Sequence, residues 1–344
     1  MSVSGTWSEP VVPGGFVEDH ADAFCRRFMA AVTEHGEDRE FEGDAITEVW
    51  GLSGLLLDPR ARLLSSPAHP RLFNPGLAVA RWLYLFSGSD RLADITAYSP
   101  GAARLTDDGV VMPGGSHGAR AFAPVSGVDQ VEQVVAVIAK LGETTRGVIA
   151  LHHPTDLVQP TDDYICVSNM LLTPRGGRLH GMVHMRSNEA LRLLWYDLFE
   201  FTMLLEYVSA RLGLELGTYL HSGFVFQITG SADRDIAATV AAETPRTSRM
   251  EPMPPMTRAD RAIVVGLERE LRESARHAPR AAFLERVHAV ADQVDPYWAD
   301  LLTAAALQAR FVAGGDAELL DDFRAVGGQV TALCVDYSCR LGAR

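Results

Sequence analysis

The amino-acid sequence predicts an α+β protein in which a mixed sheet with packed helices precedes a C-terminal helical extension. Two runs of strand composition, residues 164–172 and 179–185, flank a Pro-Arg-Gly-Gly segment at 174–177 that is typical of a hairpin turn. Segments on both sides of this hairpin carry apolar residues at helical spacing. Beyond about Thr244 the pattern changes, because the proline-rich and methionine-rich stretch 250–256 predicts a linker and the longer runs after it predict helices.

The N-terminal half is predicted to alternate helices and strands. Residues 1–16 are mixed in composition and contain prolines, which predicts an arm. The helical spacing of Phe24, Phe28 and Val32 predicts the first helix. The expected elements are a helix at 18–34, a β-rich run at about 47–57, a buried helix at 77–86, a loop at 105–124, a helix opened by Asp129 and Gln130, and a buried strand at 147–152.

The C-terminal half is predicted to become helical. A helix at 196–212 is expected to end at Gly213, and strand composition returns at 219–229. The four later helices are expected at 258–277, 281–294, 297–312 and 317–339. The expected units are therefore an N-terminal arm and helix at 1–45, a central domain at 46–245, and a helical extension at 257–344.

Composition restricts the partners. The chain has 344 residues and a formal net charge of -13, which argues against general attraction to nucleic acid or to an acidic membrane, so an anion site must be built locally from a few arginines. Its cysteines form no CxxC pair and no Cys/His metal spacing, and no signal peptide or apolar run of transmembrane length is present. We expect a reduced, cytoplasmic protein without structural zinc. The four cysteines are Cys25, Cys166, Cys334 and Cys339.

The segment from Cys166 to Asp197 carries the strongest chemical signal. It contains a candidate nucleophile, Cys166, a candidate anion clamp, Arg186 with Ser187, and a candidate base reader, Asp197. Each has a plain alternative. A lone cysteine on a strand is usually core, an arginine usually forms a surface ion pair, and Asp197 could cap a helix beginning near Leu198.

The order and spacing of these residues resemble the thymidylate synthase family. Arg186 follows Cys166 by 20 positions and Asp197 follows Arg186 by 11, with the hairpin between, as in that family's Cys, Arg-Ser and Asn series. The similarity covers roughly residues 45–230 and implies a thymidylate synthase-like fold with a central catalytic domain. Further matching segments are His117 to Arg120, Asp129 with Gln130, Thr144 to Arg146, and Leu212 to His221.

The resemblance implies a covalent mechanism. Cys166 would add to C6 of a pyrimidine nucleotide, so that C5 attacks the one-carbon unit of 5,10-methylenetetrahydrofolate. Arg186 and Ser187 would hold the 5′-phosphate, and Arg146 would reach the phosphate of a partner subunit in a homodimer. Glu189 stands at the folate-side aspartate of the family. Because the nucleophile is a thiolate, we expect nearby guanidinium groups to lower the pKa of Cys166.

Departures from the family pattern point to a cytosine nucleotide. Asp197 replaces the asparagine that reads uracil; a carboxyl group accepts from N4-H2 and, when protonated, donates to N3. This replacement is typical of the deoxycytidylate hydroxymethylases. Gln227 and Thr229 replace the family's sugar-binding His-x-Tyr, which favours CMP over dCMP and resembles the CMP hydroxymethylase branch of nucleoside-antibiotic biosynthesis. His117 replaces a loop tyrosine and is a candidate for proton transfer, whereas Arg81 replaces a glutamate.

Four hypotheses follow. The first is a CMP or dCMP 5-hydroxymethyltransferase, and the second is a methyl-transferring thymidylate synthase. The third is a nucleotide-binding protein that has lost catalysis, as the change to Arg81 suggests; the fourth treats Cys166 as ordinary core. The family's short C-terminal tail is replaced by the extension, so either the extension covers the folate site in a new way or folate does not bind.

Overall fold

The computed structural model describes residues 15–41, 43–64, 72–122, 127–315 and 318–342. Most of the expected N-terminal arm, residues 1–14, lies outside them. The predicted α+β class is confirmed: in the described residues a seven-stranded sheet has the order β1-β3-β8-β7-β6-β5, with β2 paired to β3. Its strands are β1 (Phe16–Glu18), β2 (Glu37–Phe41), β3 (Asp44–Leu56), β5 (Gly147–Ala150), β6 (Val167–Arg175), β7 (Arg178–Glu189) and β8 (Glu215–Thr229).

The predicted hairpin forms, and its second strand lies in the interior of the sheet. Strands β6 and β7 are antiparallel, and the turn between them is made by Gly176 and Gly177, whose positive φ angles of 56° and 77° favour glycine. Strand β7 then runs parallel to β8, with Ser187 opposite Val225. The structure therefore places the end of β7 between Cys166, which directly precedes β6, and the second half of β8.

Helix α6 (Leu194–Leu212) is the central helix of the fold. It is buried over most of its length and packs against the sheet and against helix α2 (Pro75–Ser87). It ends at Gly213, as predicted, where φ is 65°. The predicted start at 196 is two residues too late: Leu193 occupies the cap position without a side-chain cap, so the sequence carries no start signal there.

Helix α4 (His117–Ala121) corrects the prediction of a continuous loop at 105–124. A Cβ atom on Gly118 would lie 1.9 Å from the carbonyl oxygen of Leu85, so only glycine lets α4 approach α2 this closely. The remaining short elements are α3 (Leu92–Thr96), η1 (Pro100–Arg104), α5 (Gln130–Leu141), η2 (Pro154–Leu157), α7 (Ser231–Ala241), and the paired strands β4 (Leu63–Leu64) and β9 (Thr247–Ser248).

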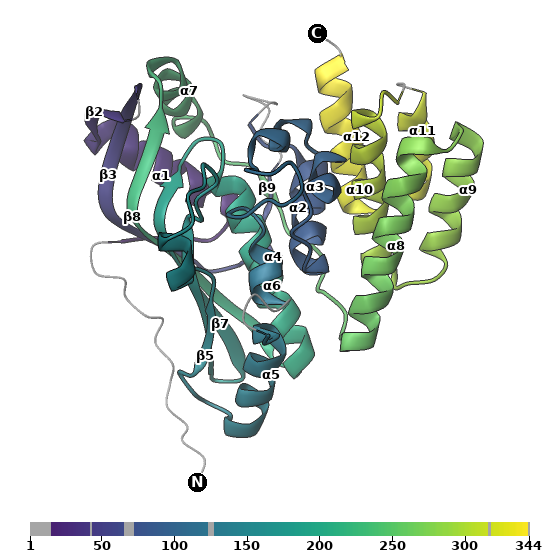
Figure 1. Cartoon of the computed structure of the whole chain (residues 1–344), viewed down its shortest axis with the longest axis horizontal. Helices are drawn as coiled ribbons and strands as arrows, with labels where there is room; N and C mark the ends of the chain where they lie inside the picture. The colour runs from purple at the N-terminus through teal and green to yellow at the C-terminus, as the bar shows by residue number, and fades with distance from the viewer. Residues whose placement is uncertain (1–14, 42, 65–71, 123–126, 316–317, 343–344) are drawn as a thin grey trace.

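The expected unit boundaries are not breaks in the packing. Helix α1 (Ala21–His35) packs on β3, and one hydrophobic cluster contains residues of α1, α6 and the C-terminal helices. Figure 1 shows α2 and α3 between the sheet and these helices. The C-terminal helices are α8 (Arg258–His277), α9 (Arg280–Ala291), α10 (Pro296–Val312), α11 (Leu319–Val326) and α12 (Gln329–Gly342).

The C-terminal helices pack on the side of α2 that faces away from the sheet. The ring of Trp298 in α10 stacks on Phe86 of α2, with centroids 5.3 Å apart. The single helix predicted at 317–339 is wrong, because the chain breaks at Gly327 and Gly328. A Cβ atom on Gly328 would lie 2.7 Å from a carboxylate oxygen of Asp300.

Candidate active site

Cys166 lies at the entrance to β6 and contacts the end of β7. The Arg186 amide donates to the Cys166 carbonyl oxygen over 2.8 Å, which fixes the two strands at this point. The hydroxyl of Ser187 lies 3.7 Å from Sγ, and Nη2 of Arg186 lies 3.8 Å from it. The thiol is half-buried and therefore differs from Cys25 and Cys334, which are buried. The predicted nucleophile and anion clamp thus meet.

The electrostatics of Cys166 differ from the expectation of a lowered pKa. Burial raises the pKa of the thiol and outweighs the Arg186 guanidinium and the Ser187 hydroxyl, which both lower it. The charges of Asp197 and Asp163 raise it further. The expected guanidinium effect is present, but desolvation is larger.

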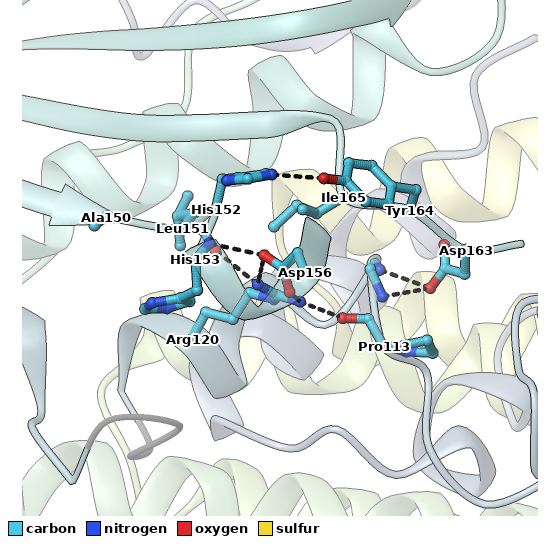
Figure 2. A network of polar contacts seen from close by, with 12 residues as sticks. Pro113, Arg120, Ala150, Leu151, His152, His153, Asp156, Asp163, Tyr164 and Ile165 are labelled. Atoms are coloured by element: carbon cyan, nitrogen blue, oxygen red, sulfur yellow. Dashed lines mark hydrogen bonds and ion pairs between the residues drawn. The ribbon is translucent and has the colours of Figure 1, made fainter. Parts of the chain in front are cut away.

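The guanidinium of Arg186 is fixed by backbone carbonyl groups on one side and is partly exposed to solvent. Its Nε donates to the carbonyl oxygen of Ile165 over 2.8 Å, and its Nη2 donates to that of Tyr164 over 3.1 Å. The guanidinium carbon lies 4.8 Å from the centroid of the Tyr164 ring, and Figure 2 shows the Tyr164 hydroxyl bound in turn to His152. The side chain is exposed, and its Nη1 also donates to the Ser187 hydroxyl over 3.3 Å, so only part of the guanidinium is open to solvent.

A buried polar network anchors the loops around Cys166. Arg120 of α4 binds Asp156 in a bidentate ion pair with distances of 2.8 and 2.9 Å (Figure 2). Asp163 accepts from the amides of Gly114 and Gly115, and so joins the loop before α4 to the segment before β6. This network positions His117, the first residue of α4, relative to Cys166.

A second group of charged residues is centred on Glu200 of α6. Arg81 of α2 donates through Nε to Glu200 and lies 3.3 Å from Asp197 through Nη2. Nδ1 of His117 lies 3.2 Å from the other Glu200 oxygen, and Asn188 donates to Asp197 over 2.7 Å. The structure therefore brings His117 and Asp197 together around Arg81 and Glu200.

The pKa values of the two carboxyl groups in this cluster are shifted in opposite directions. Burial raises the pKa of Asp197, and the opposing Arg81 charge does not cancel it. Burial also acts on Glu200, but Arg81 and His117 outweigh it and hold the pKa of that carboxyl below its ordinary value. Glu200 is therefore an ionised carboxylate, whereas Asp197 is shifted toward its protonated form.

Sequence reasoning missed Glu200. One signal was available, because Arg81 lies in an otherwise apolar helix, and a half-buried guanidinium in such surroundings favours an acidic partner. Glu200 also lies three positions after Asp197, on the same face of α6. The pairing itself joins residues 119 positions apart, which no local pattern reveals.

Three predicted residues lie outside the direct contacts of Cys166 and Asp197. Arg146 is exposed before β5, and its guanidinium has no protein partner in the part of the chain that is described. Gln227 and Thr229 lie on β8. Gln227 is opposite Glu189, so it shares a sheet face with Ser187, two residues earlier on β7.

Glu189 at the end of β7 is directed toward its own turn. One carboxylate oxygen accepts from the Arg192 amide, and the other is buried without a partner in the described residues. Burial raises the pKa of Glu189 to about 7.

A cavity of about 230 Å³ adjoins the Glu200 cluster. It is lined by α2, by the segment between α3 and α4, and by the start of α6, and its lining residues include Leu77, Arg81, Leu105, Tyr196 and Glu200. Neither Glu189 nor any residue of the C-terminal helices lines it. The described residues of the extension therefore do not contribute to the lining of this cavity.

Comparison with known proteins leaves the family open. No protein-family model and no curated protein matches the sequence.

The described residues contain no group of three or more His, Cys, Asp or Glu side chains that could hold a metal ion. Each helix in the described ranges is too short or too polar to cross a lipid bilayer.

Proposed function

We propose that this protein belongs to the thymidylate synthase family and is a pyrimidine-nucleotide 5-hydroxymethyltransferase. Its substrate would be a cytosine nucleoside monophosphate, CMP in preference to dCMP, and 5,10-methylenetetrahydrofolate would supply the one-carbon unit. The observation that carries the proposal is the meeting of Cys166 with Arg186 and Ser187, together with a buried Asp197 whose pKa is raised by burial. This arrangement combines a nucleophile, an anion clamp and a cytosine reader.

Cys166 would act as the nucleophile at C6 of the pyrimidine. Its Sγ lies within reach of two donors, and both stabilise a thiolate relative to a thiol. Arg186 is suited to a phosphate as well, because its guanidinium is fixed by backbone carbonyls and by Tyr164 while part of the fork faces solvent.

Asp197 would select the base. A protonated carboxyl group donates to N3 of cytosine and accepts from N4-H2, whereas uracil presents the reverse pattern. The raised pKa of Asp197 supports this assignment, and Asn188 and Arg81 hold its two oxygens in place. Gln227 and Thr229, on the sheet face of Ser187, are suited to bind ribose hydroxyl groups, which favours CMP.

The cavity beside Glu200 would receive the ring system of the folate. Aliphatic and aromatic side chains line it, and Arg81 and Glu200 provide a polar edge. Glu189, the residue that corresponds to the folate-side aspartate, lies outside its lining.

A homodimer would complete the phosphate site through Arg146, which is free to reach a partner subunit. The exposed rings of Trp50 and Phe224, stacked 5.6 Å apart on β3 and β8, are suited to such an interface.

The test is release of tritium from C5 of labelled CMP, dCMP, UMP and dUMP in the presence of the folate. The proposal predicts release from CMP first, and no release from the Cys166→Ser variant. Absence of release from both cytosine nucleotides would rule out this activity. Formation of dihydrofolate during turnover would instead indicate a methyl-transferring thymidylate synthase.

A non-catalytic nucleotide-binding protein is the second candidate, and Arg81 favours it. Calorimetry separates it from an enzyme: equal CMP affinity in the parent and in Cys166→Ser, with no tritium release from the parent, would support simple binding.

A further inference from the structure

Glu200 is a buried carboxylate that the reaction proposed above does not by itself require. Its side chain is 4% exposed, and burial of a lone carboxylate costs several kcal/mol unless it is paired. Two partners offset that cost. Arg81 occupies one oxygen through Nε, and Nδ1 of His117 lies 3.2 Å from the other.

The charge state of Glu200 determines which atom of His117 carries a proton. Arg81 and His117 lower the pKa of Glu200 against the effect of burial, so the carboxylate is ionised near neutral pH and can only accept hydrogen bonds. Nδ1 must therefore donate. The opposite nitrogen, Nε2, has no partner among the described residues. It is not one of the side-chain atoms that are fully buried and lack a hydrogen bond.

Other charged groups surround the pair without bonding to the imidazole ring. Arg81 and Tyr84 come from α2 and Asp197 from α6, whereas the ring of Phe201 lies 5.4 Å from that of His117. The loop before His117 is held by Asp163, which binds the amides of Gly114 and Gly115 rather than the ring. Glu200 is thus the group in hydrogen-bond contact with His117.

We infer that Glu200 is the positioning residue of this site, and that it fixes His117 with a proton on Nδ1 and leaves Nε2 without a protein partner among the described residues. This rests on the contacts of Glu200, while its catalytic use rests on the proposed function. In that reaction Nε2 would take a proton from water as the remaining hydroxide bonds to the exocyclic methylene carbon; the double bond between that carbon and C5 breaks, its electron pair re-forms C5=C6, and the bond from C6 to Sγ of Cys166 breaks to release the thiolate. Arg81, although it replaces a carboxylate, keeps Glu200 charged.

Glu200→Gln changes the pattern in a defined direction. Arg81 can only donate, so the amide oxygen of the new side chain must face Arg81 and its NH2 group must face His117. Nδ1 of His117 then has to accept, and the ring proton moves to Nε2. Glu206→Gln is the matched control, because Glu206 is equally buried on α6 and paired with Arg60 and Arg62.

The test is nitrogen NMR of histidine side chains, with the His117 signals assigned by their loss in His117→Asn. We expect Nδ1 of His117 to be protonated in the parent and in Glu206→Gln, and unprotonated in Glu200→Gln. A parent protein with an unprotonated Nδ1 would overturn the inference, as would an unchanged tautomer in Glu200→Gln. The protonation of Nδ1 in the parent protein tests the inference even if Glu200→Gln does not fold.

Turnover provides a separate readout. Glu200→Gln should lower kcat with CMP about 10²-fold and change KM little, whereas Glu206→Gln should retain kcat. If the parent protein shows no turnover, the proposed function fails while the NMR result still decides the role of Glu200. If the parent turns over and kcat of Glu200→Gln is unchanged, the catalytic use of Glu200 is excluded.

Discussion

Cys166 lies under opposing influences, and their balance determines its reactivity. Burial raises the pKa of the thiol, and Arg186 and Ser187 partly offset it. When a bound substrate excludes water, Arg186 and Ser187 would be the groups that still stabilise the thiolate. The reactivity of Cys166 should therefore respond to changes in either donor.

Replacement of Arg186 by leucine should make Cys166 less reactive. Loss of the guanidinium removes the largest opposing effect, so the midpoint of alkylation moves to higher pH and the rate at pH 8 falls several-fold. Alkylation by iodoacetamide, followed by mass spectrometry of the Cys166 peptide, measures this. Arg178→Leu at the other end of β7 is the control, and an unchanged midpoint in Arg186→Leu would contradict the contact.

Asp197→Asn should shift nucleotide preference from cytosine to uracil. The amide carries one donor and one acceptor, and in the orientation of the family's asparagine its NH2 group donates to O4 and its oxygen accepts from N3-H of uracil. We expect CMP affinity to fall by at least tenfold, about 1.4 kcal/mol, and UMP affinity to rise, as measured by calorimetry. Loss of both affinities in equal measure would indicate that Asp197 only supports the fold.

Glu189 predicts a pH dependence of stability. The folded-state pKa of about 7 lies above the ordinary value of 4.5, so the folded state binds more protons between these limits and stability falls as pH rises from 4.5 to 7. Glu189→Gln should therefore raise the free energy of unfolding above pH 7, by about 1–3 kcal/mol, and leave it nearly unchanged near pH 4.5. Urea unfolding at both pH values checks this, and equal effects at both would contradict it.

At the scale of elements, helix α4 depends on one close contact. Gly118→Ala would press a methyl group against the Leu85 carbonyl oxygen and should cost about 1–3 kcal/mol. Gly266→Ala in α8 is the control, because nothing lies within 4 Å of its Cβ position and alanine is the better helix former there. Thermal unfolding compares the two; a neutral Gly118→Ala would show that α4 does not pack on α2 as described.

The elements also show what the sequence can reveal. Helix α8 begins after a Thr257 capping box with Asp260 and was predicted to the residue. The β6–β7 hairpin followed from its two glycines. The start of α6 lacks a capping side chain and is therefore not encoded locally. The break between α11 and α12 does have a local signal in Gly327 and Gly328, and the distant Asp300 accepts from the Gly328 amide there.

The same distinction holds for the site. Cys166, Arg186, Ser187 and Asp197 lie within one stretch of chain, so spacing along the sequence could bring them together. The role of Glu200 depends on its contacts with Arg81 on α2 and His117 on α4. Tertiary packing brings these residues together, so the sequence alone does not reveal that role.

At the scale of the whole molecule, the C-terminal helices support α2 and hence Arg81. Trp298 is 2% exposed and stacks on Phe86, so Trp298→Ala should destabilise the protein by about 3–5 kcal/mol. Trp50→Ala should cost far less, because Trp50 is 58% exposed. Denaturant unfolding measures both. Equal, small losses would show that the helical extension folds independently of the sheet.

The central claim is that Cys166 attacks C6 of a cytosine nucleotide. Incubation with 5-fluoro-CMP and 5,10-methylenetetrahydrofolate tests it most directly. The normal reaction removes the C5 hydrogen as a proton, and fluorine in its place cannot be removed in this way, so the covalent adduct accumulates. We predict that intact-mass analysis shows the protein carrying one nucleotide and one folate, and that peptide mapping places both on Cys166. Absence of the adduct, or an adduct on the exposed Cys339, would contradict the claim.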